Sequence, residues 1–508
     1  MDAVILTTPF KFGSAEQQFL KLTKQLSSPD TIGMRHSALE NLITVEGREL
    51  LRRLFEEHIK LRGHCDAGAS VTGSDGIIRT HKRLRKRTLI SVFGEVEIER
   101  MGYSARGESS LFLKDALLNL PMDSYSHGIK RLIAKEAAKN SFDEAIDTVK
   151  EMTGVLIPKR QAEIIVKKVV DDFDQFYTNQ SLSESEHTVS VLPIVVLTTD
   201  GKGIVMRRED LREITKKKAE ASEHKFKKRM SRGEKANAKR MSTVASVYSI
   251  AKFVRTPEQI IGELTAKESC SGERPRPVAK RVWASIEKEA VQVTADMFNE
   301  ALRQDPQKQK QWVCLVDGDW RQLVRIREQA KKVGVNLTII MDIIHVIEYL
   351  WKAARAFYDE TDSEVEKWVT KRLHGILQGK AGHVAAGIRR SATLRNLSEK
   401  SREPIEKCAG YLLKRTPYLR YDLYLKEGFP IATGIIEGAC RHLIKDRMDV
   451  TGARWSLKGA EAIIKLRSLR SSGDFDRYWE FHEDQEYLRN HFSQYANPTI
   501  IEQQLQSA

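Results

Sequence analysis

Three apolar segments of this sequence each run directly into an aspartate. They are VVLTTDGKG at 195–203, WVCLVDGDW at 312–320 and IIMDIIH at 339–345. Short apolar runs rich in valine, isoleucine and leucine predict buried strands, and the glycines beside two of the aspartates allow a close approach to the backbone. A carboxylate at the end of a buried strand costs free energy unless it has a partner. Whether these acids meet therefore depends on the order of the strands.

The order of the predicted elements is specific. We expect a first strand that ends at Asp200, a tight turn at Gly201 and Gly203 into a second strand, and a third strand in STVASVYSIAKFV. The elements that follow would be a helix at 276–304, the strand that ends at Asp317, a helix from Arg321 to Lys332 and the strand VNLTIIM. This is the order of an α/β ribonuclease H-like fold. Since its first and fourth strands are neighbours, Asp200 and Asp317 would lie side by side.

A third acid from a later helix would complete a metal site. Glu437, in GIIEGACRHLIKDRM, has the right place in the order. Carboxylate oxygens are the ligands that Mg²⁺ prefers, and two ions about 4 Å apart can activate an attacking oxygen and stabilise a leaving one. Carboxylates packed so closely would repel one another without cations. The sequence thus predicts Asp200, Asp317 and Glu437 as a two-ion Mg²⁺ site, in which Mn²⁺ could substitute.

The motifs TTDGKG, LVDGDW, MDIIHVIEYLW and GIIEGACRHLIKDRMDVTGARW occur in that order. Together they resemble bacterial insertion-sequence DDE transposases of the ISKra group, relatives of the Mutator-like and hAT-like branch, over most of 90–470. The resemblance implies that Asp200, Asp317 and Glu437 are the catalytic triad. Their separations are 317 − 200 = 117 and 437 − 317 = 120 residues, and the resemblance places an all-helical insertion before the glutamate helix.

The same resemblance implies an activity and partners. The chain would bind insertion-sequence ends and catalyse Mg²⁺-dependent DNA cleavage and strand transfer, acting on terminal inverted repeats and target DNA as a homodimer or higher homo-oligomer. One alternative is a structure-selective nuclease or resolvase on the same fold. A proofreading-type exonuclease would need a second acid where Lys202 stands. A domesticated, non-catalytic DNA-binding protein is the other alternative, although all three acids are present.

Three further residues are secondary site candidates. Asp319 could replace Asp317, but its place before a predicted helix favours N-capping. Asp342 and His345 match the [CD]xxH signature shared by the Mutator-like and hAT-like branch, and their i, i+3 spacing puts them on one helix face. His345 could contact DNA or orient the active site. A core histidine is the alternative interpretation.

Several basic or aromatic residues near the acids are predicted to contact DNA. Arg441 and Lys445 follow Glu437 at i+4 and i+8, which favours phosphate binding over an ordinary helix ion pair. Arg454 and Trp455 could stack on an unpaired base, although a buried tryptophan is an equal alternative. The stretch 202–240 holds 15 Lys/Arg and 6 Asp/Glu, so we expect a backbone-contact surface there rather than only a solvated face. Its lysine cluster is Lys216, Lys217 and Lys218.

The N-terminal third predicts a mainly helical DNA-binding region. A helix at about 36–62 is followed by the basic run RTHKRLRKR at 79–87, which contains Arg83 and Arg85, and by a β-hairpin at about 87–101 around Phe93-Gly94. The pattern at 126–173 predicts three short helices, with Ser141 as the N-cap of the middle helix and Gly154 at its C-terminal end. These could form a helix-turn-helix whose last helix carries Lys159 and Arg160 toward DNA; an ordinary helical hairpin is the alternative.

These observations divide the chain into five parts and a polar linker. The linker would lie at 179–190. The parts are an N-terminal mainly helical DNA-binding region at 1–178, the first part of the ribonuclease H-like core at 190–350, an all-helical insertion at 351–428, the last part of the core with the glutamate helix at 429–480, and a tail at 481–508.

Composition agrees with a polyanionic partner. The 84 Lys+Arg against 69 Asp+Glu give a formal net charge of +15, which favours nucleic acid over other partners. Five scattered cysteines without a CxxC pair favour a reducing compartment. No apolar run approaches the ~20 residues of a membrane helix, so we expect no membrane partner. The expected location is the bacterial cytoplasm, in association with the nucleoid.

Overall fold

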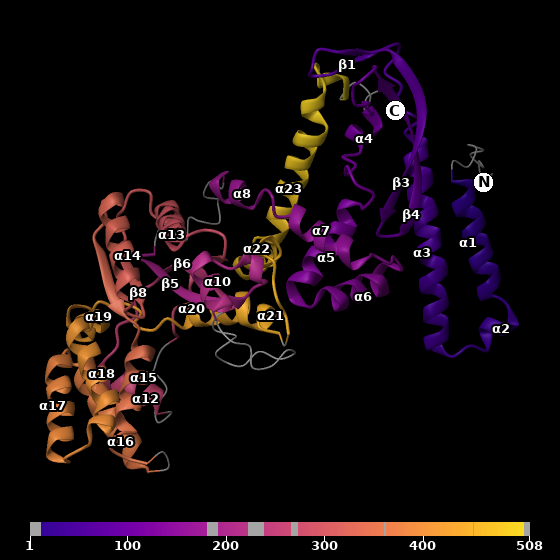
Figure 1. The fold of residues 1–508 in the computed structure, drawn as a ribbon. Coiled ribbons are helices and arrows are strands. Elements are labelled where there is room, and N and C mark those ends of the chain that lie inside the picture. The colour runs from indigo at the N-terminus through magenta and orange to yellow at the C-terminus, as the bar shows by residue number, and fades with distance from the viewer. Residues whose placement is uncertain are drawn as a thin grey trace, which may run out of the picture. The chain divides into compact units, whose positions relative to one another are not determined.

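The computed structural model describes residues 12–179, 192–221, 238–265, 273–359, 362–450 and 452–501. The chain forms two compact units (Figure 1). Unit 1 joins Met1–Thr178 to Phe475–Ala508, and unit 2 is Asn179–Asp474. The linker predicted at 179–190 lies almost wholly outside the described residues, as do 222–237 of the basic stretch and the end of the predicted tail.

Unit 2 is a mixed α/β structure built on a five-stranded sheet. The strands are β5 (Ile194–Val205), β6 (Lys239–Ile250), β7 (Val278–Ser285), β8 (Gln311–Val316) and β9 (Leu337–Met341). They lie in the order β7-β6-β5-β8-β9. β6 pairs antiparallel with β5 and with β7, whereas β8 pairs parallel with β5 and with β9. The first and fourth strands of the sheet are therefore neighbours, as the sequence predicts.

Two of the predicted strands and one helix were placed wrongly. The first strand does not turn at Gly201 and Gly203, because β5 continues to Val205 and pairs with β6 along its whole length. A Cβ at Gly203 would lie 3.0 Å from the Lys239 side chain, so this glycine serves close packing between strands rather than a turn. The region 276–304 was predicted as one helix. Its first part is instead the third strand, β7, and the helix α13 spans Ala290–Gln304.

Apolar side chains explain why this sheet forms. Residues 194–197 and 312–316 are fully or almost fully buried and belong to one core cluster. Continuous apolar runs of this kind are typical of strands that are covered on both faces of the sheet. Helix α13 packs against β5 and β6, and α22 (Leu457–Ser472) packs against β7. Helix α14 (Trp320–Val333) connects β8 to β9 and ends at Gly334, whose φ of 71° closes it.

From Ile343 to Lys426 the described residues form helices and the turns that connect them. Figure 1 shows these helices grouped together in orange. They are α15 (Ile343–Ala354), α16 (Glu364–Leu377), α17 (Ala381–Leu394), α18 (Glu399–Arg415) and α19 (Tyr421–Lys426). Their buried side chains join the same core cluster as the sheet. This helical insertion is therefore packed onto the sheet and is not a separate domain.

Unit 1 is mainly helical, with a long β-hairpin. Its helices are α1 (Gly13–Leu26), α2 (Pro29–Ile32), α3 (His36–Leu61), α4 (Leu113–Leu117), α5 (His127–Lys139), α6 (Phe142–Thr153), α7 (Lys159–Lys168), α8 (Phe173–Asn179) and α23 (Phe475–Asn490). Two short strands, β1 (Val71–Thr72) and β2 (Ile78–Arg79), precede the hairpin. Ser141 caps α6 in a capping box and Gly154 ends it with a φ of 75°, which confirms both predicted helix signals.

The hairpin is longer than the predicted 87–101. It consists of β3 (His81–Ser91) and β4 (Gly94–Ser104), so most of the basic run lies on a strand. Lys86 pairs across the strands with Glu97 at 2.7 Å and Glu99 at 3.1 Å. Opposite charges facing each other across the ladder allow strand pairing to continue through the basic run.

The chain end does not behave as the tail predicted at 481–508. Helix α23 folds back on unit 1, where the Tyr478 hydroxyl donates to the Val169 carbonyl at 2.8 Å. Asp172, which is buried, accepts from His482 at 2.6 Å and from Arg489 at 2.9 Å. These contacts join residues about 310 positions apart, so local sequence patterns carry no sign of them. Among the described residues, no helix combines the length and apolar character needed to cross a bilayer.

Candidate active site

Three aspartates are associated with neighbouring parallel strands: Asp200 lies within β5, and Asp317 and Asp342 directly follow β8 and β9. Thr198 of β5 is opposite Leu315 of β8, so continuing this register by two residues puts Asp200 opposite Asp317. Val316 of β8 is opposite Met341 of β9. One further residue brings Asp342 opposite Asp317, and the Asp342 N–H donates to the Val316 carbonyl at 2.8 Å. Extended in this way, the two registers align Asp200, Asp317 and Asp342 in one row.

Asp200 is half-buried and contacts the helix that carries Glu437. The Sγ–H of Cys440 donates to one Asp200 carboxylate oxygen at 3.2 Å, and the Gly201 N–H donates to the other at 2.6 Å. Burial raises the pKa of the Cys440 thiol, and the Asp200 charge raises it further. Cys440 therefore remains a neutral thiol that binds Asp200. The sequence analysis missed it, although it stands only three residues after the predicted Glu437.

The turn after β8 is held by the helical insertion. The Tyr411 hydroxyl donates to the Asp317 carbonyl at 3.0 Å, and Arg415 Nε donates to the Gly318 carbonyl at 2.9 Å. Gly318 has a φ of 96°, and a Cβ there would lie 3.0 Å from Met341 Sδ and 3.2 Å from Arg415 Nε. Helix α18 thus fixes the backbone that presents the Asp317 side chain. No local sequence signal indicated Tyr411 or Arg415.

Glu437 lies on α20 (Gly434–Ala439) and is exposed. Its pKa is raised by burial of the carboxyl and then by the negative charges of Asp342, Glu348 and Asp200, while His345 lowers it. The Glu437 carboxyl therefore shares an acidic environment with two of the aligned aspartates.

Asp342 is fully buried and connects the two ends of the helical insertion. It caps α15 by accepting from the Ile344 N–H at 3.0 Å. It also accepts from the Thr433 N–H at 3.3 Å and from the Thr433 hydroxyl. Burial raises the Asp342 pKa, and the Thr433 hydroxyl opposes that shift. Because the Thr433 carbonyl accepts from the Glu437 N–H at 3.1 Å, Asp342 anchors the first turn of the Glu437 helix.

The other two secondary candidates differ in role. Asp319 is exposed and caps α14, accepting from the N–H groups of Arg321 at 2.9 Å and Gln322 at 3.0 Å. This is the N-capping that its position predicts. His345 is half-buried, and its Nδ1 lies 3.9 Å from a Glu348 carboxylate oxygen.

The basic residues after Glu437 lie on a π-helical turn, Cys440–Lys445. Such turns are rare and are frequently found at functional sites. Arg441 and Lys445 are both exposed. Arg441 Nε lies 3.5 Å from an Asp446 carboxylate oxygen, and His442 Nδ1 lies 3.2 Å from the other. Asp446 therefore neutralises part of this basic surface.

Trp455 is buried, which is the alternative that its place in the sequence left open. Its Nε1–H donates to the Met448 carbonyl at 3.2 Å, and the Arg447 guanidinium lies 4.8 Å from its ring centroid. Its backbone pairs with the end of β5 through the Val205 carbonyl, at 3.1 Å. Packing beside the sheet determines this position. Arg454, by contrast, is exposed.

The remaining predicted DNA contacts fall in both units. Lys217 and Lys218 are exposed on α10 (Glu213–Glu220) of unit 2, and Lys216 is half-buried. Those of unit 1 are Arg83 and Arg85, exposed on β3, and Lys159 and Arg160, exposed at the start of α7. Lys159 pairs with Asp143 at 2.6 Å.

Within the part of the chain that the structure describes, the four acids have no cationic partner. In the described ranges, no Lys or Arg forms an ion pair with Asp200, Asp317, Asp342 or Glu437. No group of three or more His, Cys, Asp and Glu side chains is gathered tightly enough there to hold a metal ion. Carboxylate oxygens without ion-pair partners are nevertheless the donors that a hard divalent cation needs.

Comparisons with known proteins add little. No family model matches the sequence, and no curated protein matches it. A solved structure described as the Drosophila P element transposase strand transfer complex is similar over 75% of this chain and 84% of that chain. The TM-score is 0.24 and the identity 11%, values too low to support an argument about this chain.

Proposed function

We propose that this chain is a DDE-type DNA transposase with a ribonuclease H-like core. The observation that carries the proposal is the parallel register of β5 and β8, whose last pair, Thr198 and Leu315, stands two residues before Asp200 and Asp317. Asp200, Asp317 and Glu437 are its catalytic acids. The strand order β7-β6-β5-β8-β9 supports the ribonuclease H-like assignment, because a three-strand meander is followed by two parallel strands on the other side of β5.

The donor set fits divalent cations. The Asp200, Asp317 and Glu437 carboxylates would hold Mg²⁺, or Mn²⁺ in its place, and the bound ions would supply an activated hydroxyl oxygen and charge stabilisation at the displaced one. Burial is the largest cause of the raised Glu437 pKa, and the neighbouring Asp342, Glu348 and Asp200 carboxylates add to it by disfavouring the charged form. Cys440 and Gly201 orient the Asp200 carboxylate by donating to both of its oxygens.

DNA is the proposed partner. Exposed Lys217, Lys218 and Lys445 provide phosphate contacts in unit 2, and the exposed arginines of the β3 strand provide them in unit 1. Phosphate contacts of this kind position a protein on DNA without reading its sequence. The substrates would be the ends of the insertion sequence and the target DNA, and synapsis of two ends requires at least a dimer.

The test compares two neighbouring aspartates. Asp317→Asn should abolish Mg²⁺-dependent cleavage of duplexes that carry the DNA flanking the reading frame, because an amide is a poor Mg²⁺ ligand. DNA binding should stay nearly unchanged, and Asp200→Asn and Glu437→Gln should behave alike. Asp319→Asn is the matched control, since asparagine is also a good N-cap, and should cleave normally.

A second readout does not depend on cleavage. Mn²⁺ should raise the thermal unfolding midpoint of the wild type and of Asp319→Asn more than that of Asp317→Asn, because a ligand that binds only the folded state stabilises it. Cleavage by Asp317→Asn at the wild-type rate would remove Asp317 from the site.

A further inference from the structure

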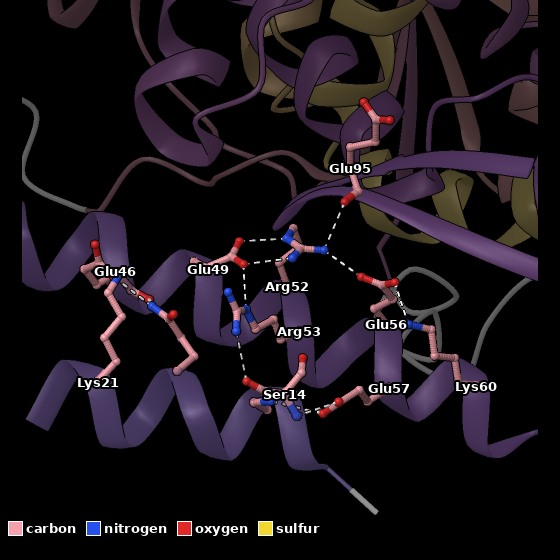
Figure 2. Close-up of polar contacts among 12 residues, drawn as sticks. Ser14, Lys21, Glu46, Glu49, Arg52, Arg53, Glu56, Glu57, Lys60 and Glu95 are labelled. Atoms are coloured by element: carbon pink, nitrogen blue, oxygen red, sulfur yellow. Dashed lines mark hydrogen bonds and ion pairs between the residues drawn. The ribbon is translucent and has the colours of Figure 1, made fainter.

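Helix α3 of unit 1 presents three distinct faces, and the first contacts α1. Figure 2 shows the polar contacts on this side. The Ser14 N–H donates to a Glu57 carboxylate oxygen at 2.8 Å, and the Ser14 carbonyl accepts from Arg53 at 3.1 Å. Lys21 Nζ lies 3.1 Å from a Glu46 carboxylate oxygen. The contact between α1 and α3 is therefore largely polar.

The second face of α3 contacts the β-hairpin. Ile59 is buried there in a small core cluster with hairpin side chains. The Phe55 and Phe93 rings lie 5.9 Å apart, edge to face. Arg52 donates to the Glu95 carbonyl at 3.4 Å (Figure 2). The charged groups on these two faces pair with one another, as Arg52 does with Glu49 at 2.7 Å and with Glu56 at 2.6 Å.

The third face is apolar and exposed. At about 100° per residue, the positions on this side follow one another at intervals of 4, 4, 3, 4 and 3 residues. They are Ile43, Gly47, Leu51, Leu54, His58 and Leu61. The four large apolar side chains keep 43%, 46%, 38% and 41% of their surface exposed, in the order Ile43, Leu51, Leu54 and Leu61. This set is called the α3 seam below.

The spacing of the α3 seam predicts the kind of partner. From Gly47 to Leu61 the intervals alternate between four and three residues, as in a left-handed coiled coil, so the partner is another helix with the same spacing. The seam extends over about 27 Å, at about 1.5 Å per residue. It contains no charged residue, and α3 as a whole has five Glu against four Lys or Arg. In a chain of net charge +15, this is a surface suited to protein rather than to DNA.

We propose that the α3 seam is the dimer interface of this protein, occupied by the α3 seam of a second copy in antiparallel orientation. A two-fold axis midway between Leu51 and Leu54 places Leu51 of each copy against Leu54 of the other copy. The same axis places Gly47 of one copy against His58 of the other, a small residue against a large one. A Cβ at Gly47 would meet nothing within 4 Å, so space is open for that imidazole.

The charge distribution is compatible with a second copy as the partner. Two copies, each with a net charge of +15, repel each other, and this repulsion is least when the surfaces that meet are uncharged, as the α3 seam is. An isologous contact needs a self-complementary surface, and a seam with leucines on both sides of its centre provides one. The inference rests on unit 1 alone and does not depend on the proposed catalytic function.

The first test is the mass of the full chain in solution without DNA. By light scattering or sedimentation equilibrium, the wild type should have twice the chain mass of 57.9 kDa. Leu51→Lys combined with Leu54→Lys should have the single-chain mass, because two like charges would face each other across the axis. Phe19→Lys with Leu20→Lys is the matched control; these α1 residues are 52% and 57% exposed, and this variant should remain a dimer. Circular dichroism checks that each variant is folded.

The second test fixes the orientation. Gly47→Cys combined with His58→Cys should form a disulfide between copies under mild oxidation, and neither single substitution should. The α3 seam is not the interface if the wild type is a monomer or if the double lysine variant keeps the dimer mass. A cross-link through Gly47→Cys alone would overturn the antiparallel arrangement.

Discussion

The Asp317-Gly318 turn depends on groups far away in the sequence. The left-handed φ of Gly318 and its contact with Arg415 leave no room for a side chain, and the adjacent Asp317 carbonyl accepts from Tyr411. Two insertion residues therefore donate to the two consecutive carbonyls of Asp317 and Gly318. At this scale the insertion acts as a support for the active site.

Removal of the Tyr411 hydroxyl tests whether the insertion supports the Asp317 backbone. Tyr411→Phe should lower the free energy of unfolding by about 1 kcal/mol, since it removes a partly buried hydrogen bond. Cleavage should slow, with DNA binding unchanged, because the Asp317 backbone becomes less restrained. Tyr349→Phe is the matched control, as its ring stacks on Tyr411 at 4.2 Å and its hydroxyl has no hydrogen-bond partner among the described residues. Chemical denaturation and single-turnover cleavage measure both effects; equal losses in the two variants would argue against a specific role for the hydroxyl.

Strand β5 and helix α10 differ in what they contribute. Strand β5 carries Asp200 in its interior and continues to Val205, so the backbone of Asp200 is held by pairing with Val244 of β6. Helix α10 is only eight residues long and has one buried side chain, Ala219. Its exposed lysines can therefore adapt to a phosphate backbone without disturbing the core.

Charge removal on α10 separates phosphate binding from catalysis. Replacing Lys216, Lys217 and Lys218 with glutamine should weaken binding to terminal-repeat and scrambled duplexes alike. Each lost phosphate contact should lower the slope of log K against log salt by about 0.9. The control replaces three exposed lysines of α18 in the same way, namely Lys400, Lys407 and Lys414. If the slope stays at the wild-type value in a salt titration, α10 is only a solvated face, and residues 79–87 become the next candidates.

At the scale of the whole molecule, the chain end returns to unit 1. Residues 475–508 belong with the N-terminal region and not with unit 2, which immediately precedes them. The buried Asp172 carboxylate fastens α23, with His482 and Arg489 as its partners. Unit 1 therefore consists of two distant segments of the chain, and truncation at about 475 would expose its core.

The Asp172 cluster predicts acid sensitivity. Burial acts to raise the Asp172 pKa, but hydrogen bonds from His482 and Arg489 outweigh it and hold the pKa at about 2. The unfolded value is about 3.9, so the folded state binds this proton less readily. The stabilisation is therefore complete above about pH 4 and is lost as pH falls toward 2.

Thermal unfolding from pH 6 to pH 2 tests this. Asp172→Asn should be less stable than the wild type at pH 6, and the difference should shrink toward pH 2. Asp147→Asn, a substitution at an exposed position of α6, should follow the wild-type curve. A constant difference between Asp172→Asn and the wild type across this range would show that the Asp172 charge does not control acid stability.

The sequence by itself determined the features that depend on local chemistry. Apolar runs that end in acids predicted the strands before Asp317 and Asp342, and the order of elements predicted that β5 and β8 are neighbours. Capping residues such as Ser141 and Asp319 were readable because a cap acts within a few residues.

The tertiary structure alone decided the features that depend on distant partners. The second strand is β6 rather than a strand just after Gly203 because Met241 and Lys239 pack against the two glycines. Trp455 is buried because its backbone pairs with the end of β5. The contacts from Cys440 to Asp200 and from Tyr411 to Asp317 join residues 240 and 94 positions apart. Periodicity and capping report only on neighbours along the chain, and such pairs become visible only after the chain has folded.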